Sequence, residues 1–271
     1  MAVDAGRAGT VGGANGGVTR RAAFDRSGLR RSLNRYLAER PGRVSVAVRD
    51  LATGLSYAHG TKLRPGTASI VKVQIVMALL LQARREERML TSDERDLAER
   101  AIVVSDNDAA TALWRAIGGG AGLAEAGRRL GLKHTEPGQG TAWGATTTSA
   151  TDQVRLLAAL TSAGGPLSSR DRHHVLGLMR NVVPEQAWGV SAAAGDGAEV
   201  ALKNGWLPRV ADGGAWTVNS IGRIHDGGHD YLIAVVSDHH ASMAEGVEAV
   251  EHAGATVVSA LARAGDDAGT R

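Results

Sequence analysis

The sequence predicts an α+β protein in which one antiparallel sheet, formed by both ends of the chain and flanked by helices, carries an inserted all-α lobe. Strand-like stretches occur only before residue 60 and after residue 198, while the residues between them read as helices separated by polar turns. The chain has 271 residues, of which 43% are hydrophobic, enough for a large buried core. We expect a functional site in the cleft between the sheet and the inserted lobe.

The first part of the chain begins with a Gly-rich segment, residues 1–22, that lacks a periodic apolar pattern and predicts a flexible tail. Leucines then recur at helical spacing from Phe24 to just before Pro41, which predicts an amphipathic helix. Alternating valines and the turn Ala52-Thr53-Gly54 predict a β-hairpin. Its two strands are expected at residues 44–48 and 55–59.

The middle of the chain shows six helical patterns. The triplet Gly118-Gly119-Gly120 ends the third of them, and the stretch 134–148, which contains Pro, Gly and three consecutive Thr, predicts a loop. The expected helices cover residues 69–82, 92–104, 109–117, a short stretch that ends at 130, 149–160 and 168–179.

The last third returns to strand patterns, with Asp226-Gly227-Gly228 as a tight turn, and closes with a helix. Strands are expected at 199–203, 215–224 and 231–237, and the helix at 241–264. We therefore divide the chain into a tail (1–22), an α/β lobe (23–66 and 199–264), a helical lobe (67–198) and a C-terminal tail (265–271).

Composition excludes several classes of function. The 31 basic and 28 acidic residues occur in mixed runs rather than in one long stretch of basic residues, which argues against a nucleic-acid partner. The absence of cysteine excludes disulfides and thiolate chemistry. The longest apolar run, Ile75 to Leu81, is too short to span a bilayer, so we expect no membrane partner. No secretory signal is visible, so we expect a cytoplasmic protein as the sequence stands, or a secreted one if an upstream signal has been removed.

The motif Ser69-Ile70-Val71-Lys72 stands at the start of a predicted helix, and a spacing of three places the serine and lysine on one face. A serine hydroxyl becomes a good nucleophile when a base takes its proton, and a lysine can be that base when burial lowers its pKa. Free backbone N–H groups at the helix start favour negative charge developing there. Because the pattern is common by chance, the alternative is an N-capping serine followed by a solvated lysine.

Two further motifs occur in other structural settings. Ser105-Asp106-Asn107 lies between two helices of the inserted lobe, where a hydroxyl can relay a proton and an amide can bind a substrate carbonyl or the lysine; a helix cap is the alternative. Lys203-Asn204-Gly205 ends a predicted strand, where glycine admits a substrate to the backbone and lysine offers a cation to a carboxylate. A strand-ending turn is the alternative there.

In order and setting, these motifs resemble the Ser-x-x-Lys, Ser-Asp-Asn and Lys-Thr-Gly elements of the class A β-lactamases and penicillin-binding proteins, over about residues 24 to 264. The resemblance implies a β-lactamase/transpeptidase-like fold and a serine hydrolase or acyltransferase that acts on an amide, ester or lactam through an acyl-serine intermediate. It implies no metal or organic cofactor. The expected partner is a small-molecule or peptide-like substrate with a carbonyl and a carboxylate, and the sequence leaves the oligomeric state open.

The resemblance also implies a role for each matching side chain. Ser69 would be acylated, and Lys72 would take its proton. Ser105 would pass the proton to the leaving group, and Asn107 would orient the substrate. Lys203 would bind a carboxylate or tune Ser105.

Further residues of the cleft follow from the same resemblance. The backbone N–H groups of the nucleophile and of Trp206 would form the oxyanion hole, beside Gly205. Independently of the resemblance, Arg209 could help Lys203 hold a substrate carboxylate, with an exposed arginine as the alternative. Trp143 and Trp188 are expected to fill a core that is poor in aromatic residues, with lining of the cleft as the alternative.

Two departures from the family pattern bear on activity. Asn204 replaces the family's threonine; an amide can donate a hydrogen bond to a carboxylate, but with different geometry, so we expect a different substrate preference. The loop before Thr146 lacks the Glu-x-x-Leu-Asn element whose glutamate activates the deacylating water in class A β-lactamases. Glu136 is the candidate substitute base, with a solvated loop glutamate as the alternative. We therefore expect a poor β-lactamase.

Two other functions stay open. One is a true β-lactamase or D-alanyl-D-alanine carboxypeptidase with an atypical loop. The other is a non-catalytic relative that binds a ligand in the cleft. The joint presence of Ser69, Lys72, Ser105 and Lys203 argues against the second, because a binding protein has no need of all four.

Overall fold

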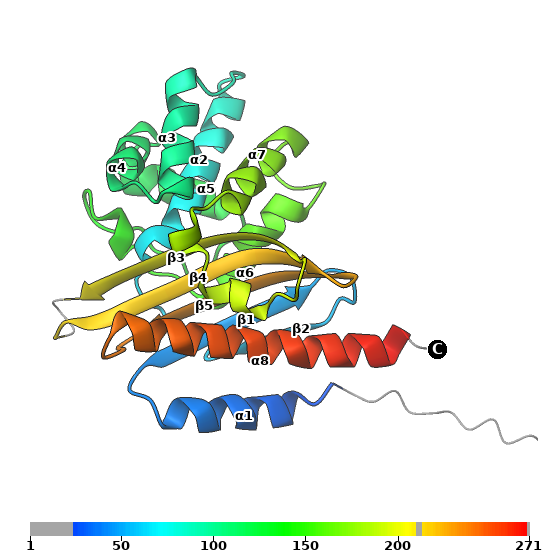
Figure 1. The fold of residues 1–271 in the computed structure, drawn as a ribbon. Coiled ribbons are helices and arrows are strands. Elements are labelled where there is room, and N and C mark those ends of the chain that lie inside the picture. The colour runs from blue at the N-terminus through cyan, green and yellow to red at the C-terminus, as the bar shows by residue number, and fades with distance from the viewer. Residues whose placement is uncertain (1–23, 210–212, 270–271) are drawn as a thin grey trace, which may run out of the picture.

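The structure, a computed structural model, describes residues 24–209 and 213–269, so the tail expected at 1–22 lies outside it. An antiparallel sheet with the strand order β2-β1-β5-β4-β3 forms the centre. Strands from both chain ends share this sheet and helices fill the sequence between them, which confirms the predicted α+β fold (Figure 1). The strands are β1 (Arg43–Asp50), β2 (Ser56–His59), β3 (Glu199–Arg209), β4 (Ala215–Asp226) and β5 (His229–Asp238).

Strand β3 is longer than its sequence suggests. Asn204-Gly205 and Pro208 read as the end of a strand, yet β3 pairs with β4 until Arg209 lies opposite Ala215. The reason is its place in the sheet, because β3 is an edge strand and a proline in an edge strand can turn its missing donor away from the ladder. The extension carries Gly205 and Trp206 past the start of the helical lobe.

One face of the sheet is covered by α1 (Arg26–Ala38) and α8 (Met243–Gly269), and the other by the helical lobe (Figure 1). Asp25 caps α1 by accepting a hydrogen bond from the Gly28 N–H at 2.7 Å. Helix α8 continues to Gly269, so the tail expected from residue 265 is wrong for residues 265–269; 270–271 lie outside the description. Within the described residues, no helix is both long enough and apolar enough to cross a membrane.

Helix α2 is the central helix of the lobe and is buried along nearly its whole length, polar Lys72 and Gln74 included. Capping boxes start two of its neighbours, α3 and α7. Gly118, with φ of 83°, ends α4, and its two following glycines already belong to α5, so the triplet both ends one helix and begins the next. The lobe helices are α2 (Val71–Arg85), α3 (Ser92–Val103), α4 (Asn107–Ala116), α5 (Gly119–Arg129), α6 (Ala150–Thr161) and α7 (Ser169–Arg180).

Two hydrophobic clusters lie on opposite faces of the sheet. The first joins α2 and the other lobe helices to the sheet, and the second joins the sheet to α1 and α8. Residues of the segment after α7, among them Trp188 and Val190, pack in the second cluster. Packing therefore places this segment with α8 rather than with the helical lobe, to which residues up to 198 were assigned from the sequence.

Candidate active site

Ser69 lies in a single 3₁₀ turn, η1 (Ala68–Ile70), that leads directly into α2. The turn is fixed by its surroundings, because the amide of Asn219 on β4 donates to the Gly66 and Thr67 carbonyls at 2.9 and 3.0 Å. Ala68 has a φ of 47°, a strained value for a residue with a side chain. Ser69 itself is partly exposed, and within residues 24–209 and 213–269 its hydroxyl makes no hydrogen bond.

Lys72, one turn further along, is completely buried. Its Nζ donates to the Ser105 carbonyl at 2.7 Å, to Asn107 Oδ1 at 2.8 Å and to Ser105 Oγ at 3.2 Å. Burial lowers the pKa of Lys72 to about 8, against the opposing negative charge of Asp106. A considerable fraction of this lysine is therefore uncharged at mildly alkaline pH, as a proton acceptor must be.

Lys203 reaches the same hydroxyl from β3. Its Nζ donates to Ser105 Oγ at 3.0 Å, to the Asn204 carbonyl at 3.1 Å and to Gln186 Oε1 at 3.2 Å. Burial, reinforced by the positive charge of Lys72, lowers the pKa of Lys203 to about 7. Ser105 Oγ thus lies between two buried amines, both of which can lose a proton near neutral pH.

The backbone between α3 and α4 holds Ser105 in this position. Ser105 has a φ of 57°, in the left-handed region that non-glycine residues seldom adopt. Asp106 follows as the N-cap of α4, where its Oδ1 accepts from the Ala109 N–H at 3.0 Å, and its other oxygen accepts from Arg100 Nε at 3.1 Å. The cap predicted as the alternative function of this motif is therefore present, but Asp106 performs it and leaves Ser105 and Asn107 to face Lys72.

Strand β3 lies directly against the turn that carries Ser69. A Cβ atom on Gly205 would lie 2.6 Å from the Ser69 nitrogen and 2.7 Å from the Ile70 nitrogen. Only glycine fits there without moving backbone. Gly205 therefore permits the contact between strand and turn on which the shape of the site depends.

The side chains of Asn204 and Trp206 point to the other face of β3, because neighbours along a strand alternate. Asn204 is completely buried, and its amide donates to the carbonyls of Gln186 and Trp188 at 2.7 and 2.9 Å. The Trp206 ring contacts the Trp188 ring edge-on, with 5.6 Å between centroids. The expectation that the Asn204 amide donates to a substrate carboxylate is thus contradicted by its burial, and Trp206 can serve the cleft only through its backbone.

Glu136 and Arg209 lie at the margin of the site. Glu136 is exposed and pairs through its backbone with Thr147, while its carboxylate makes no hydrogen bond or ion pair within the described part of the chain. A Cβ atom on Gly66 would lie 2.6 Å from Arg209 Nη1, so this guanidinium packs against the backbone that precedes η1. Arg209 is therefore near the Ser69 turn, as a carboxylate anchor needs to be.

Two further residues belong to the site, and one of them was not predicted. Trp143 packs against the core of the helical lobe, as expected, and the centroid of its ring also lies 4.8 Å from Lys72 Nζ, where a 3.1 Å hydrogen bond from its Nε1 to Thr111 holds it. Gln186 accepts from Lys203 and donates to the Val104 carbonyl at 3.1 Å, which ties β3 to the loop that carries Ser105. Gln186 lies in an aperiodic loop without a motif, so the sequence contained no signal for it.

Comparison with known proteins identifies the family of the chain. A model of the Beta-lactamase enzyme family matches residues 90–261, a range that includes Ser105 and Lys203 and begins after Ser69. The Mycobacterium tuberculosis protein named "Putative lipoprotein LppW" is 31% identical over 186 residues, which are 67% of this chain and 59% of that protein. The chain thus spans less than two thirds of this curated relative.

Solved structures of similar fold cover nearly all of the described chain. PBP-A matches with a TM-score of 0.75 and 22% identity, over 88% of this chain and 97% of its own. The TLA-1 extended-spectrum β-lactamase, solved as a serine-to-glycine variant, matches with a TM-score of 0.77 and 18% identity, over 87% of this chain and 98% of its own. A β-lactamase from Streptosporangium roseum matches with a TM-score of 0.74 and 21% identity, over 88% of this chain and 99% of its own. The fold is that of these β-lactamases and of PBP-A, and by its matching family model the chain belongs to the β-lactamase enzyme family.

Proposed function

We propose that the protein is a serine hydrolase or acyltransferase that acts on an amide, ester or lactam through an acyl-Ser69 intermediate. The observation that carries the proposal is the hydrogen-bonded cluster in which Lys72 and Lys203 both contact Ser105 Oγ, one helical turn from a partly exposed serine. Burial lowers the pKa of both lysines toward neutrality, which suits a proton acceptor and not a solvated cation.

The acylation step follows from these groups. Ser69 Oγ attacks the carbonyl carbon while its proton passes to the uncharged amine of Lys72. The backbone N–H groups of Ser69 and Trp206 stabilise the oxyanion. When the bond to the leaving group breaks, the proton moves from Lys72 through Ser105 Oγ to the leaving nitrogen or oxygen. Lys72 is then uncharged again, and the acyl group remains as an ester of Ser69.

Substrate binding would rest on a smaller set of side chains than the family pattern suggests. Lys203 and Arg209 are the candidates for a carboxylate, while the buried Asn204 contributes none of its amide donors. Asn107 already accepts from Lys72, which leaves its amide nitrogen for a substrate carbonyl.

Deacylation, the release of the acyl group from Ser69, is the step that we expect to be slow. No described carboxylate contacts the cluster of Ser105 and the two lysines, and Glu136 is exposed at the margin. PBP-A, whose fold is similar, has been solved as an acyl-enzyme complex with penicillin G in a variant form. We expect a penicillin to acylate Ser69 and to leave slowly, so that β-lactam turnover is poor and the physiological substrate is a different acyl compound.

The proposed enzyme also needs a place of action and a molecule that accepts the acyl group from Ser69. The curated relatives are named as lipoproteins, which favours the secreted alternative over the cytoplasmic one. In that case a peptide-like substrate outside the cytoplasm fits the site. Whether water or an amine receives the acyl group is decided by adding amines during deacylation and analysing the products.

The test is intact-protein mass spectrometry over time after addition of penicillin G and, separately, a cephalosporin. We expect Ser69 to gain the whole mass of the penicillin, because opening a lactam ring releases no fragment, and the adduct to persist for hours. Ser69→Ala is the control and should stay unmodified. Rapid loss of the drug with at most a fleeting adduct would show a working β-lactamase, and an adduct on Ser69→Ala would remove Ser69 from its role.

A further inference from the structure

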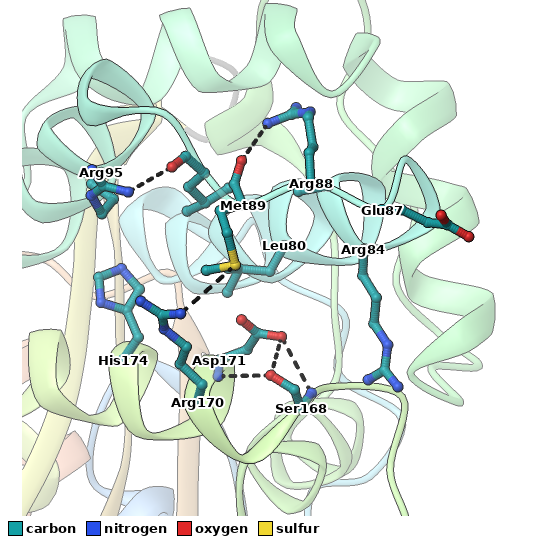
Figure 2. Close-up of a pocket in the computed structure, with 12 residues that line it drawn as sticks. Leu80, Arg84, Glu87, Arg88, Met89, Arg95, Ser168, Arg170, Asp171 and His174 are labelled. Carbon is teal, nitrogen blue, oxygen red and sulfur yellow. Dashed lines mark hydrogen bonds between the residues drawn. The ribbon is translucent and has the colours of Figure 1, made fainter.

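Helix α2 borders a solvent cavity at one end and is closed at the other. At its far end from Ser69, a cavity of about 490 Å³ lies between the α2–α3 connection and α7, with Leu80 and Asp171 among the side chains around it (Figure 2). A cavity of this size has room for water. At the near end, Lys72 is completely buried, so the groups around its amine decide whether water can reach it.

An indole ring covers one side of this amine. The hydrogen bonds of Lys72 Nζ go to Ser105 and Asn107, and the centroid of the Trp143 ring lies 4.8 Å from Nζ. Trp143 is partly exposed, whereas Lys72 beneath it is not. The ring therefore separates the amine from solvent on this side.

Hydrogen bonds to α4 hold the ring in place. Trp143 Nε1 donates to Thr111 Oγ1 at 3.1 Å, and the same hydroxyl donates to the Asn107 carbonyl at 2.8 Å. Asn107 in turn accepts from Lys72 through its side chain. The ring and the amine that it covers are therefore parts of one hydrogen-bonded unit.

The turn η2 (Trp143–Ala145) lies against the turn η1 that carries Ser69. A Cβ atom on Gly144 would lie 3.8 Å, an ordinary contact distance, from the Cα of Ala68, the residue before Ser69. The indole thus lies on Lys72 in a turn that contacts the turn of the nucleophile. A water molecule that attacked an acyl-Ser69 ester and gave its proton to Lys72 would have to enter this region.

We propose that Trp143 is a positioning residue that keeps water away from Lys72 and so prolongs the life of the acyl-Ser69 ester; this inference rests on the proposed function. In hydrolysis, a water oxygen attacks the ester carbon and its proton passes to the uncharged amine of Lys72. The proton then moves to Ser69 Oγ as the ester bond breaks, and the acyl group leaves as a carboxylic acid.

An apolar ring over the amine opposes the first of these steps, because it excludes the water that has to give up its proton. Without the ring, Lys72, Asn107 and Thr111 would offer entering water the polar partners that a bound water molecule needs. Removal of the ring should therefore speed hydrolysis.

Release of the acyl group from preformed adduct tests the proposal. The parent protein and its variants are acylated with penicillin G, freed from excess drug and followed by intact-protein mass spectrometry. Trp143→Ala should lose the adduct about tenfold faster than the parent protein or more. Trp143→Phe keeps a ring over Lys72 and should release the adduct at close to the parent rate. Because the measurement starts from acylated protein, it does not depend on the rate of acylation.

Trp114→Phe is the matched control. Trp114 anchors the same loop from α4, through a 2.9 Å hydrogen bond from its Nε1 to the Gly140 carbonyl. Its replacement loosens the loop but leaves the indole over Lys72, so release should match that of the parent protein.

Equal release rates for the parent protein and Trp143→Ala, or an equal acceleration by Trp114→Phe, would overturn the proposal. Absence of an adduct in the parent protein would instead overturn the proposed function, and this inference with it. If Trp143→Ala does not fold, Trp143→Leu takes its place with the same expectation, since leucine fills only part of the space of the ring.

Discussion

Ser105 shows how single residues make this site. Its hydroxyl lies within hydrogen-bond distance of two buried amines, and its strained backbone is held by the cap and ion pair of Asp106. Two positive charges beside one another in a buried site are unfavourable, so the lysines titrate as a pair with apparent pKa values near 7 and near 8. Between these values the pair carries one proton.

The one-proton state predicts how acylation depends on pH. Lys72 must be uncharged to accept the Ser69 proton, and Lys203 must be charged to attract a substrate carboxylate. Since Lys203 has the lower pKa, the required form, with Lys72 uncharged and Lys203 charged, is the minor form of the one-proton state. Its population still rises with pH through about 7, is highest between 7 and 8 and falls above 8, and the acylation rate constant for a penicillin should follow it. For an ester without a carboxylate, only the loss of a proton from Lys72 matters, so the rate constant should rise through about 8 and not fall.

Stopped-flow or quenched mass-spectrometric rates, measured between about pH 6 and pH 9 with both substrates, check this prediction. A rate that does not change over this range would show that neither lysine titrates there. The same fall for both substrates would mean that Lys203 does not act on the carboxylate.

Asn204 shows which part of the site could be read from the sequence. The three motifs contain Ser69, Lys72, Ser105, Asn107 and Lys203. The structure joins the last four by hydrogen bonds, while Ser69 lies one turn before Lys72 and its hydroxyl makes no hydrogen bond among the described residues. The direction of Asn204 could also have been found, because Lys203 and Asn204 are neighbours on a strand and must face opposite ways. Gln186 could not, because its role depends on where an irregular loop passes β3.

At the scale of elements, the site depends on the contact between β3 and the 3₁₀ turn at Ser69. Gly205→Ala should disturb this contact, since the added Cβ meets backbone nitrogen atoms at 2.6 and 2.7 Å that no side-chain rotation can relieve. We expect a loss of about 1–3 kcal/mol in the free energy of unfolding. Because Ser69 itself moves, acylation by penicillin should slow by about 100-fold.

Urea unfolding and the rate of adduct formation measure these two effects. Gly164→Ala is the matched control, because nothing lies within 4 Å of the position of its Cβ and its φ is not positive. This variant should keep its acylation rate and be as stable as the parent protein or slightly more stable. If Gly205→Ala acylated at the parent rate, the strand would not shape the site.

Element order was predictable because hydrophobic periodicity is local, whereas several boundaries depend on partners. Helix α5 begins inside a glycine triplet that reads as a breaker, and α8 runs past residue 264 to Gly269. Strand β3 runs past Pro208 because it lies at an edge. For β3 the deciding contact is the pairing with β4, a different part of the chain that local propensity does not record.

At the scale of the whole molecule, the sheet joins the two chain ends, and α6, which packs on β1 and β5, joins the sheet to the helical lobe. Strand β5 lies between β1 and β4 and is buried from Tyr231 to Asp238. Helix α2 belongs to the same hydrophobic cluster as Leu232, Ala234 and Val236 of β5. The two lobes therefore share one core, although the sequence divides them.

This shared core predicts that α2 and β5 unfold as one unit. Their amide hydrogens should exchange only through global unfolding, with the opening free energy found by denaturant, because both elements are buried in one continuous hydrophobic cluster. The short edge strand β2, which pairs only with β1, should exchange through easier local opening and serves as the internal reference. Hydrogen exchange followed by mass spectrometry at increasing urea separates the two classes. A lower opening free energy for α2 than for β5 would show instead that the helical lobe unfolds independently of the sheet, and that the Ser69 turn lies between two separately folding units.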